Sequence, residues 1–323
     1  MEDDATDRPL ARLAYEARRR GGCFTRQQAL VEGVTPNRLD HLVTTAAIVT
    51  VHPGRGVYRF AGAPATWESD LHAGALVMGP AAVVSHRSAA RLWDLQRFGT
   101  TRAFEVLVAG RKSRKAPADV RVHHTRWLPD DEVVKVGTHE RVTSVTRTVR
   151  DLARYLDDDA LLEVAVDAWR RGLTDPERLA RCDAELVGAW GAARMRRVLE
   201  AMDSQCVRAR SVPELRVHVL IVRDGRYPPH VLDHAVVLEG GRRVVFDLAW
   251  PELLAAVEVD STRYHGTDYD QERDRERDAA TAAGRWFVLR ITTDDLERPA
   301  EVLAAIAAHL DRARQTLPAR LAA

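Results

Sequence analysis

The stretch that decides the fold reads Val244-Val-Phe-Asp-Leu-Ala-Trp-Pro-Glu-Leu-Leu-Ala-Ala-Val-Glu-Val-Asp260. Asp247 ends one apolar run, and a turn at Trp250-Pro251 leads into a second run that carries Glu258 and Asp260. Side chains two positions apart in a strand leave the same face, so Glu258 and Asp260 project together. If the two strands pair as a hairpin, Asp247 lies near Glu258, and three carboxylates converge at strand ends.

Carboxylates that lie close together favour a cation between them. Like charges raise each other's pKa unless a cation neutralises them, and Mg²⁺ or Mn²⁺ prefers such oxygen ligands. We therefore expect Asp247, Glu258 and Asp260 to hold a divalent ion that activates water and polarises a phosphodiester. The alternative is that these acids are solvated residues at strand edges.

The residues around this hairpin predict a mixed α/β segment over 206–316. Ser211 and Glu214 form a capping box that opens a helix. Apolar runs predict strands, and amphipathic or charged runs predict helices. The expected strands are 231–238, 242–248, 253–259 and 286–291, and the expected later helices are 268–283 and 299–316, with a frayed tail from 319.

This segment resembles the PD-(D/E)XK nucleases, and in particular the relatives of very-short-patch-repair endonucleases. The resemblance is carried by Asp247, Glu258-Val-Asp260 and His265, followed by an acidic-basic helix and Phe287-Val-Leu-Arg290, and it spans residues 211–310. It implies a restriction-endonuclease-like α/β/α domain, a mixed sheet flanked by helices, with Mg²⁺-dependent cleavage or nicking of DNA.

The resemblance also assigns roles to single residues. Asp247 and Glu258 match the two metal-binding acids, and Asp260 stands where the family has a lysine, as a third ligand or to orient water. His265 matches a general base or transition-state donor, and Glu214 matches an acid from the first helix. A surface-loop role for His265 and a purely capping role for Glu214 are the alternatives. Because Asp260 supplies no ammonium to steer water, a fold without catalysis is the alternative for the whole domain.

The helix expected over 268–283 carries acids and arginines in an i, i+3 arrangement. In one interpretation Arg273 and Arg277 form a ridge that faces phosphate beside the metal site. In the other the helix is solvated, and its charges pair as Asp270 with Arg273 and Asp274 with Arg277.

The first 62 residues predict a winged helix-turn-helix. A capping box at Thr25-Arg-Gln-Gln28 opens one helix, and Thr35-Pro36 opens the next. Strands over 48–51 and 57–60 flank the turn Pro53-Gly-Arg-Gly56. Helices followed by a hairpin in this order are typical of winged helices.

This segment has the features of a DNA-binding module. The later helix of a helix-turn-helix sits in the major groove, and here its exposed side would show Asn37, Arg38, His41 and Thr45, with Arg55 at the hairpin tip reaching phosphate. From residue 8 to 126 there are 19 basic and 8 acidic residues, a net charge of +11, which favours a polyanionic partner. The alternative is that the module mediates protein contacts.

A second resemblance covers this half of the chain. Residues 24–60, Ser85-His-Arg-Ser-Ala-Ala90 and Val142-Thr-Ser-Val-Thr-Arg-Thr-Val-Arg-Asp151 are similar to the winged helix and adjoining region of AbiEi-type antitoxins from actinobacteria. It implies a bacterial repressor with a cognate toxin as a possible partner.

The whole chain is then α/β with three domains: a winged helix over 8–62, a mixed but mostly helical middle domain over 66–205, and the nuclease-like domain over 206–316. Composition is that of a globular protein, with 46% hydrophobic and 29% charged residues. The longest apolar stretch, 73–84, is shorter than the roughly 20 residues of a membrane helix. Three scattered cysteines argue against disulfides and a Cys-based zinc site, and no basic-then-apolar signal opens the chain, so we expect a reducing cytoplasm.

Overall fold

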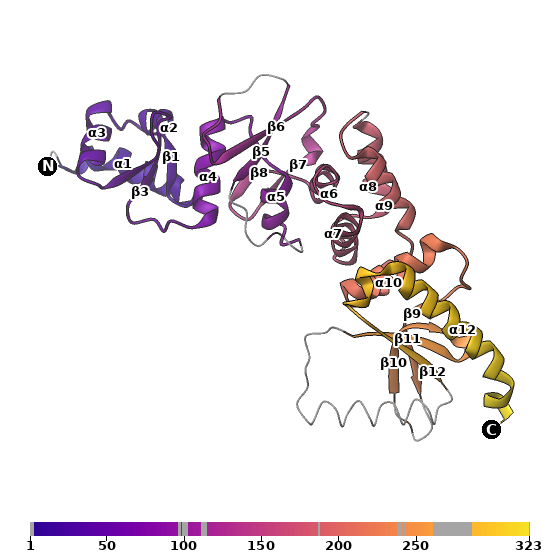
Figure 1. Cartoon of the computed structure of the whole chain (residues 1–323). Coiled ribbons are helices and arrows are strands. Elements are labelled where there is room, and N and C mark those ends of the chain that lie inside the picture. The colour runs from indigo at the N-terminus through magenta and orange to yellow at the C-terminus, as the bar shows by residue number, and fades with distance from the viewer. Residues whose placement is uncertain are drawn as a thin grey trace. The chain divides into compact units, whose positions relative to one another are not determined.

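The structure is a computed structural model of the chain, and it describes residues 3–95, 98, 103–110, 115–186, 188–237, 241, 243–260 and 286–322. The chain divides into two compact units, Met1–Arg196 and Arg197–Ala323. Each is a mixture of helices and sheets (Figure 1). In the described part of the chain, no helix combines the length and the apolarity that a bilayer-crossing segment requires.

Unit 1 begins with three helices and a small antiparallel sheet of order β1-β3-β2. Its second and third helices start where the local chemistry predicts. The Thr25 hydroxyl accepts the backbone N–H of Gln28 while Gln28 Oε1 accepts that of Thr25, and Thr35 caps the backbone N–H of Arg38. The elements are α1 (Asp3–Arg18), β1 (Cys23–Thr25), α2 (Arg26–Val31), α3 (Pro36–Thr44), β2 (Ile48–His52) and β3 (Val57–Phe60).

The inner faces of these elements form one apolar core. Leu13 of α1, Leu39 of α3 and Ile48 of β2 are each at most 1% exposed. The ring of Phe24 packs against that of Phe60 at a centroid distance of 5.0 Å. Burying a large aliphatic side chain contributes about 1.5–3 kcal/mol, so this packing fixes the position of α3.

The rest of unit 1 is built around a five-stranded sheet of order β6-β5-β4-β8-β7. The sequence predicts a mixed but mostly helical middle region, and this five-stranded sheet makes the region less helical than predicted. The strands are β4 (Val83–Val84), β5 (Phe104–Ala109), β6 (Val120–Thr125), β7 (Val133–Val136) and β8 (His139–Thr143), with a 3₁₀ turn η1 (Asp130–Glu132).

Helix α4 (Trp67–Met78) lies between the small sheet and the larger one (Figure 1). It approaches the larger sheet at Gly74, where a Cβ atom would lie 3.3 Å from Val120 and 3.5 Å from Phe104. The remaining helices are α5 (His86–Leu92), α6 (Val145–Leu152), α7 (Asp158–Arg170), α8 (Pro176–Glu185) and α9 (Ala192–Ala201). Helix α6 packs against α5, α7 and α8.

Unit 2 holds a four-stranded mixed sheet of order β12-β11-β10-β9. Strands β9, β10 and β11 are antiparallel neighbours, whereas β11 and β12 are parallel. The elements are η2 (Cys206–Arg208), α10 (Val212–Asp224), β9 (Val231–Val237), β10 (Arg243–Trp250), η3 (Pro251–Leu253), β11 (Ala255–Asp260), β12 (Phe287–Thr292), η4 (Asp295–Glu297) and α12 (Pro299–Ala322).

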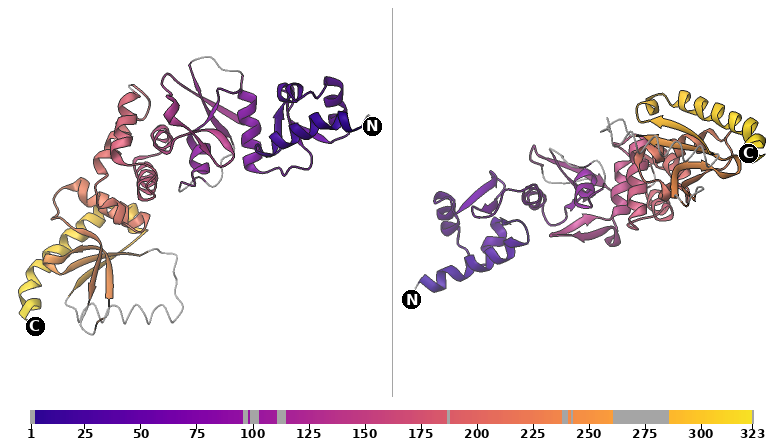
Figure 2. Two further views of the ribbon diagram at one scale, coloured as in Figure 1. Left: turned by 180° about the vertical axis from the view of Figure 1, so that it is seen from behind. Right: turned by 90° about the horizontal axis from the view of Figure 1, so that it is seen from below.

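Helices α10 and α12 contact each other, α10 packs on β10, and α12 packs on β11 and β12 (Figure 2). In the sheet, Phe246 and Trp286 pack ring to ring at 4.7 Å. Helix α12 continues through Pro318 to Ala322, so the expectation of a frayed tail from 319 is wrong. Proline at that point forgoes one hydrogen bond, but the helix is still continuous there.

Candidate functional site

The expected carboxylates lie on neighbouring strands of unit 2. Asp247 lies within β10, not at its end, because pairing with β9 and β11 extends β10 to Trp250. The pairing of β10 with β11 ends at Leu248–Val257, one position before Asp247 and Glu258. Asp247 Oδ2 accepts the backbone N–H of Val259 at 2.8 Å, so this carboxylate bridges the two strands.

Glu258 and Asp260 differ in their surroundings. Glu258 is 6% exposed, and its Oε2 lies 3.9 Å from Nε of Arg290, its register partner on β12. Asp260 is exposed at the last position of β11. The two residues are two positions apart and therefore lie on the same face of the strand. Glu258 is buried beside a guanidinium, whereas Asp260 is exposed to solvent.

The carboxylate of Glu214 accepts a hydrogen bond from the backbone just before α10. Its Oε2 accepts the N–H of Arg210 at 2.6 Å, while Ser211 Oγ accepts the N–H of Glu214. The capping box is therefore present in one half only, because the glutamate bonds one residue upstream of the cap. Glu214 is 7% exposed.

The described carboxylates do not gather tightly. Among the residues that the structure describes, the His, Cys, Asp and Glu sets whose ligand atoms all lie within 4.8 Å of one another comprise Asp203, Cys206 and His218 alone. The convergence expected of Asp247, Glu258 and Asp260 is thus limited to neighbouring positions on paired strands. Like charges repel, and each acid has a different environment. His265, Arg273 and Arg277 lie outside the described residues.

The cluster of Asp203, Cys206 and His218 is held by its own hydrogen bonds. Asp203 Oδ1 accepts the N–H groups of Gln205 and Cys206, and lies 3.1 Å from Nε2 of His218. His218 Nδ1 lies 2.8 Å from Nε2 of His230. Burial lowers the pKa of His218, although Asp203 opposes this, and burial with His218 nearby lowers the pKa of His230 to about 4. Thiol and neutral imidazole groups suit Zn²⁺ rather than Mg²⁺, so this cluster is no substitute for the expected site.

In unit 1 the residues expected to face DNA lie on one side of α3 and on the hairpin. Asn37, His41 and Thr45 are exposed, and Arg38 is half-buried. Arg55 is exposed on the β2–β3 turn. His52, at the end of β2, is buried, and its Nδ1 lies 3.9 Å from Oδ1 of Asp119.

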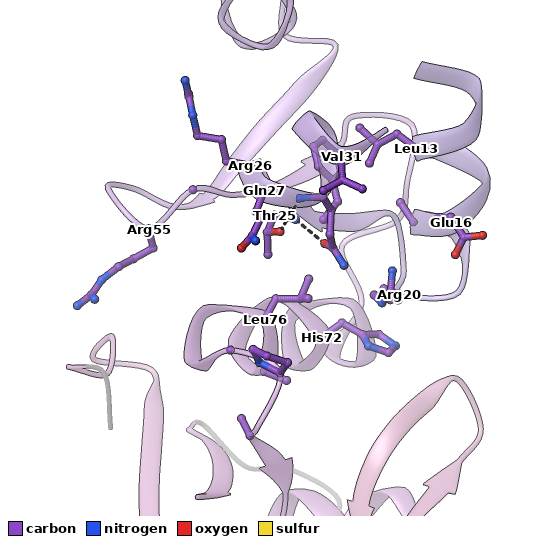
Figure 3. A pocket seen from close by; sticks show the side chains of 18 of the residues that line it. Leu13, Glu16, Arg20, Thr25, Arg26, Gln27, Val31, Arg55, His72 and Leu76 are labelled. Carbon is purple, nitrogen blue, oxygen red and sulfur yellow. Dashed lines mark hydrogen bonds between the residues drawn. The ribbon is translucent and has the colours of Figure 1, made fainter. Parts of the chain in front are cut away.

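A cavity of about 940 Å³ lies between the N-terminal elements and α4. Arg26 and Arg55 extend outward from it, and His72 and Leu76 lie across it on α4 (Figure 3). The ring of His72 stacks on His139 at 3.7 Å. Burial and this neighbour lower the pKa of His72 to about 3, and burial lowers that of His139 to about 4.

A second cavity, of about 620 Å³, lies in the middle of unit 1, where the sequence predicted no chemistry. Its walls combine arginine, histidine and aromatic side chains from β6, α5, α6 and the segments that follow α6 and α8. The lining includes His86, Arg121, His123, Arg147, Arg150, Arg154, Tyr155 and Trp190. The lining residues are spread over about a hundred positions of the sequence and form no local motif. This cavity is therefore recognisable only from the folded structure.

No protein-family model matches the chain. The uncharacterized proteins MT2308 and Rv2248 of Mycobacterium tuberculosis strains CDC 1551 and H37Rv are each 31% identical to it over 173 residues. That alignment covers 53% of this chain and 62% of each relative, so less than two thirds of their length is matched. The solved structure of the RV2827C protein of M. tuberculosis is similar with a TM-score of 0.43 and 14% identity, over 69% of this chain and 86% of that one.

Proposed function

We propose that this chain is a bacterial, cytoplasmic DNA-binding protein whose second unit has the framework of a Mg²⁺-dependent endonuclease. The observation that carries the DNA-binding part is one side of α3, where the exposed Asn37 and His41 lie beside the half-buried Arg38. The observation that favours the nuclease part is the hydrogen bond from the backbone N–H of Val259 on β11 to Asp247 Oδ2 on the paired strand β10.

Residues 8–62 act as a winged helix in this proposal. Helix α3 enters the major groove, where Asn37 and Arg38 contact base edges by hydrogen bonds. His41 and Thr45 lie farther along the same exposed side. Arg55 on the β2–β3 turn contacts phosphate, which adds affinity without sequence preference.

The second unit supports hydrolysis through its acids. The donors that Asp247, Glu258 and Asp260 offer are carboxylate oxygens, which fit Mg²⁺ or Mn²⁺. Such an ion polarises a phosphodiester and lowers the pKa of bound water. Asp247 bridges β10 and β11 through Val259, and this bond fixes where its carboxylate can point. The sheet order, with an antiparallel meander followed by a parallel strand, fits a mixed sheet flanked by helices.

The rival proposal is an AbiEi-like antitoxin or transcriptional repressor, with a cognate toxin as partner and an inactive nuclease fold as scaffold. Two observations favour it: Glu258 Oε2 lies 3.9 Å from Nε of Arg290, and Asp260 stands where the resemblance expects a lysine. Both proposals keep DNA as the first partner.

Nicking of plasmid DNA separates the two proposals. Purified full-length protein is incubated with supercoiled plasmid and Mg²⁺ or Mn²⁺, beside a Asp247→Ala/Glu258→Ala variant. The control is Glu252→Ala, which removes an exposed acid of the same unit from η3. We expect nicking by the parent and the control but not by the double variant. Equal nicking by all three proteins, or none by any, would remove the catalytic proposal and leave the repressor.

A further inference from the structure

The cavity of about 620 Å³ in unit 1 brings together two sequence stretches that the DNA-binding and nuclease proposals leave unused. One is residues 85–90, which supplies His86 at the start of α5. The other is residues 142–151, which supplies Arg147, Arg150 and Asp151 from α6. They lie some sixty positions apart in the sequence and meet only because α5 packs against α6.

A buried glutamate lies behind two of the residues that line this cavity, Arg121 and His123. Glu105 is 2% exposed, and its Oε2 accepts the backbone N–H of Arg87 at 2.8 Å. Its Oε1 lies 3.6 Å from Arg121, 3.7 Å from His123 and 3.8 Å from the Arg87 guanidinium. Burial opposes ionisation, but hydrogen bonds from His123 and from the backbone of Arg87 outweigh it and keep the pKa of the carboxyl below its usual value. Glu105 therefore remains charged and holds the basic groups around the cavity.

The histidines and the tyrosine form a rigid polar wall. Tyr155 Oη lies 3.2 Å from Nδ1 of His123, and the His123 ring stacks on that of His86 at 3.6 Å. His86 has a φ of 51°, a left-handed conformation that costs a non-glycine residue energy. Its burial and the nearby His123 lower its pKa well below the usual value. His86 is therefore a neutral imidazole on a strained backbone position of the cavity wall.

The arginines differ in how far the protein neutralises them. Arg147 is paired with Asp151 at 2.9 Å and bonded to two further oxygens, so its role is structural. Arg150 is 1% exposed and paired with Asp183, yet its Nη2 donates no hydrogen bond to any residue that the structure describes. Arg121 and Arg154 line the cavity with exposed side chains, and Arg121 also lies 3.6 Å from Glu105.

An aromatic platform lies beside these cations. Trp190 lines the cavity and is 75% exposed. The Arg154 guanidinium lies 5.5 Å from the centre of the Trp190 ring. A large indole left in water next to a cationic cavity is the arrangement that stacks the flat ring of a nucleic-acid base.

We propose that this cavity binds a mononucleotide. Guanidinium groups of Arg121, Arg150 and Arg154 receive the phosphate, since arginine binds phosphate oxygens by paired, charge-assisted hydrogen bonds. The base stacks on Trp190, and the polar wall of His123 and Tyr155 contacts the remainder of the ligand. A volume of about 620 Å³ lies in the range of small-molecule sites, roughly 300–1,000 Å³. This inference does not depend on the proposed function.

The same chemistry can come from a free nucleotide or from the phosphorylated end of a DNA strand, and titrations separate the two. Full-length protein is titrated by calorimetry with AMP, GMP, CMP and UMP, with the four matching nucleosides, and with a 5′-phosphorylated and an unphosphorylated short oligonucleotide. We expect at least one nucleotide to bind about tenfold or more tightly than its nucleoside. Tighter binding of the phosphorylated oligonucleotide than of any free nucleotide would assign the ligand to a DNA end.

Variants locate the binding within the cavity. Arg121→Ala and Arg154→Ala remove exposed side chains of the cavity lining, and each is expected to weaken phosphate-dependent binding about tenfold. The control is Arg181→Ala, which removes an exposed arginine of α8 outside the lining and is expected to leave this binding unchanged. Trp190→Phe retains partial stacking and Trp190→Ala loses it. Circular dichroism checks that each variant is folded. Absence of phosphate-dependent binding in the parent, or equal binding by the parent and both arginine variants, would overturn the inference.

Discussion

The buried guanidinium of Arg147 makes unit 1 sensitive to a single substitution. Arg147 is 2% exposed, and its three nitrogens donate to Asp151 Oδ1 at 2.9 Å, to the Trp127 carbonyl at 2.9 Å and to Thr125 Oγ1 at 3.2 Å. Replacement by alanine leaves the Asp151 carboxylate without its closest cation. Burial already raises the pKa of that carboxyl, although Arg147 opposes this.

The expected cost follows from this geometry. Removing one partner of a buried ion pair costs about 3–5 kcal/mol, because the other charge stays buried and uncompensated. Arg147→Met/Asp151→Leu removes both charges and is expected to cost clearly less than Arg147→Ala alone. Arg178→Ala breaks an exposed pair with Asp175 and is expected to cost about 1 kcal/mol or less.

Native-state hydrogen exchange measures these costs locally in the full-length chain. Since about 1.4 kcal/mol corresponds to a factor of ten, amides of α6 and β6 should exchange between two and four orders of magnitude faster in Arg147→Ala. Amides of unit 2 provide the internal reference. Equal acceleration in Arg147→Ala and Arg178→Ala, or a double variant as labile as Arg147→Ala, would refute the reasoning.

Two further predictions concern unit 1. A Cβ at Gly191 would lie 2.6 Å from the Ala153 backbone at a φ of 88°, whereas Gly188 has open space around it. Gly191→Ala should therefore lower the free energy of unfolding by roughly 3 kcal/mol, and Gly188→Ala by about 1 kcal/mol. Equal melting temperatures of the two variants would contradict the packing argument. The folded-state pKa values of His72 and His139, about 3 and about 4, lie below their usual value of about 6.5. The stability that comes from keeping both imidazoles neutral is present above pH 6.5 and is lost as the pH falls toward 4. The melting temperature of His72→Gln/His139→Gln should therefore depend less on pH over that window than that of the parent. The same pH profile for variant and parent would contradict this role of the two histidines.

Local chemistry explains what the sequence could predict. The caps at Thr25 and Thr35 depend on partners three residues away, so their helices begin where expected. The two strands on either side of Trp250-Pro251 likewise pair as the expected antiparallel hairpin, because alternation and the turn set the register.

Contacts between distant residues explain what the sequence could not predict. Strand β4 has two residues, and Val84 is a strand residue only because Val106 and Val142 pair with it. Arg150 of α6 is buried against Asp183 of α8, a contact between distant residues that no local pattern predicts. The same long-range packing assembles the mononucleotide cavity.

The most direct test of the central proposal is the salt dependence of DNA binding, measured by fluorescence anisotropy with a labelled duplex. For the parent, the logarithm of the affinity should fall linearly with that of the salt concentration. Arg55→Ala should weaken all sequences alike and make the slope shallower by about one, whereas Arg38→Ala should change the sequence preference in a binding-site selection. Binding that ignores salt, or slopes that are identical for the parent and Arg55→Ala, would contradict DNA recognition by residues 8–62.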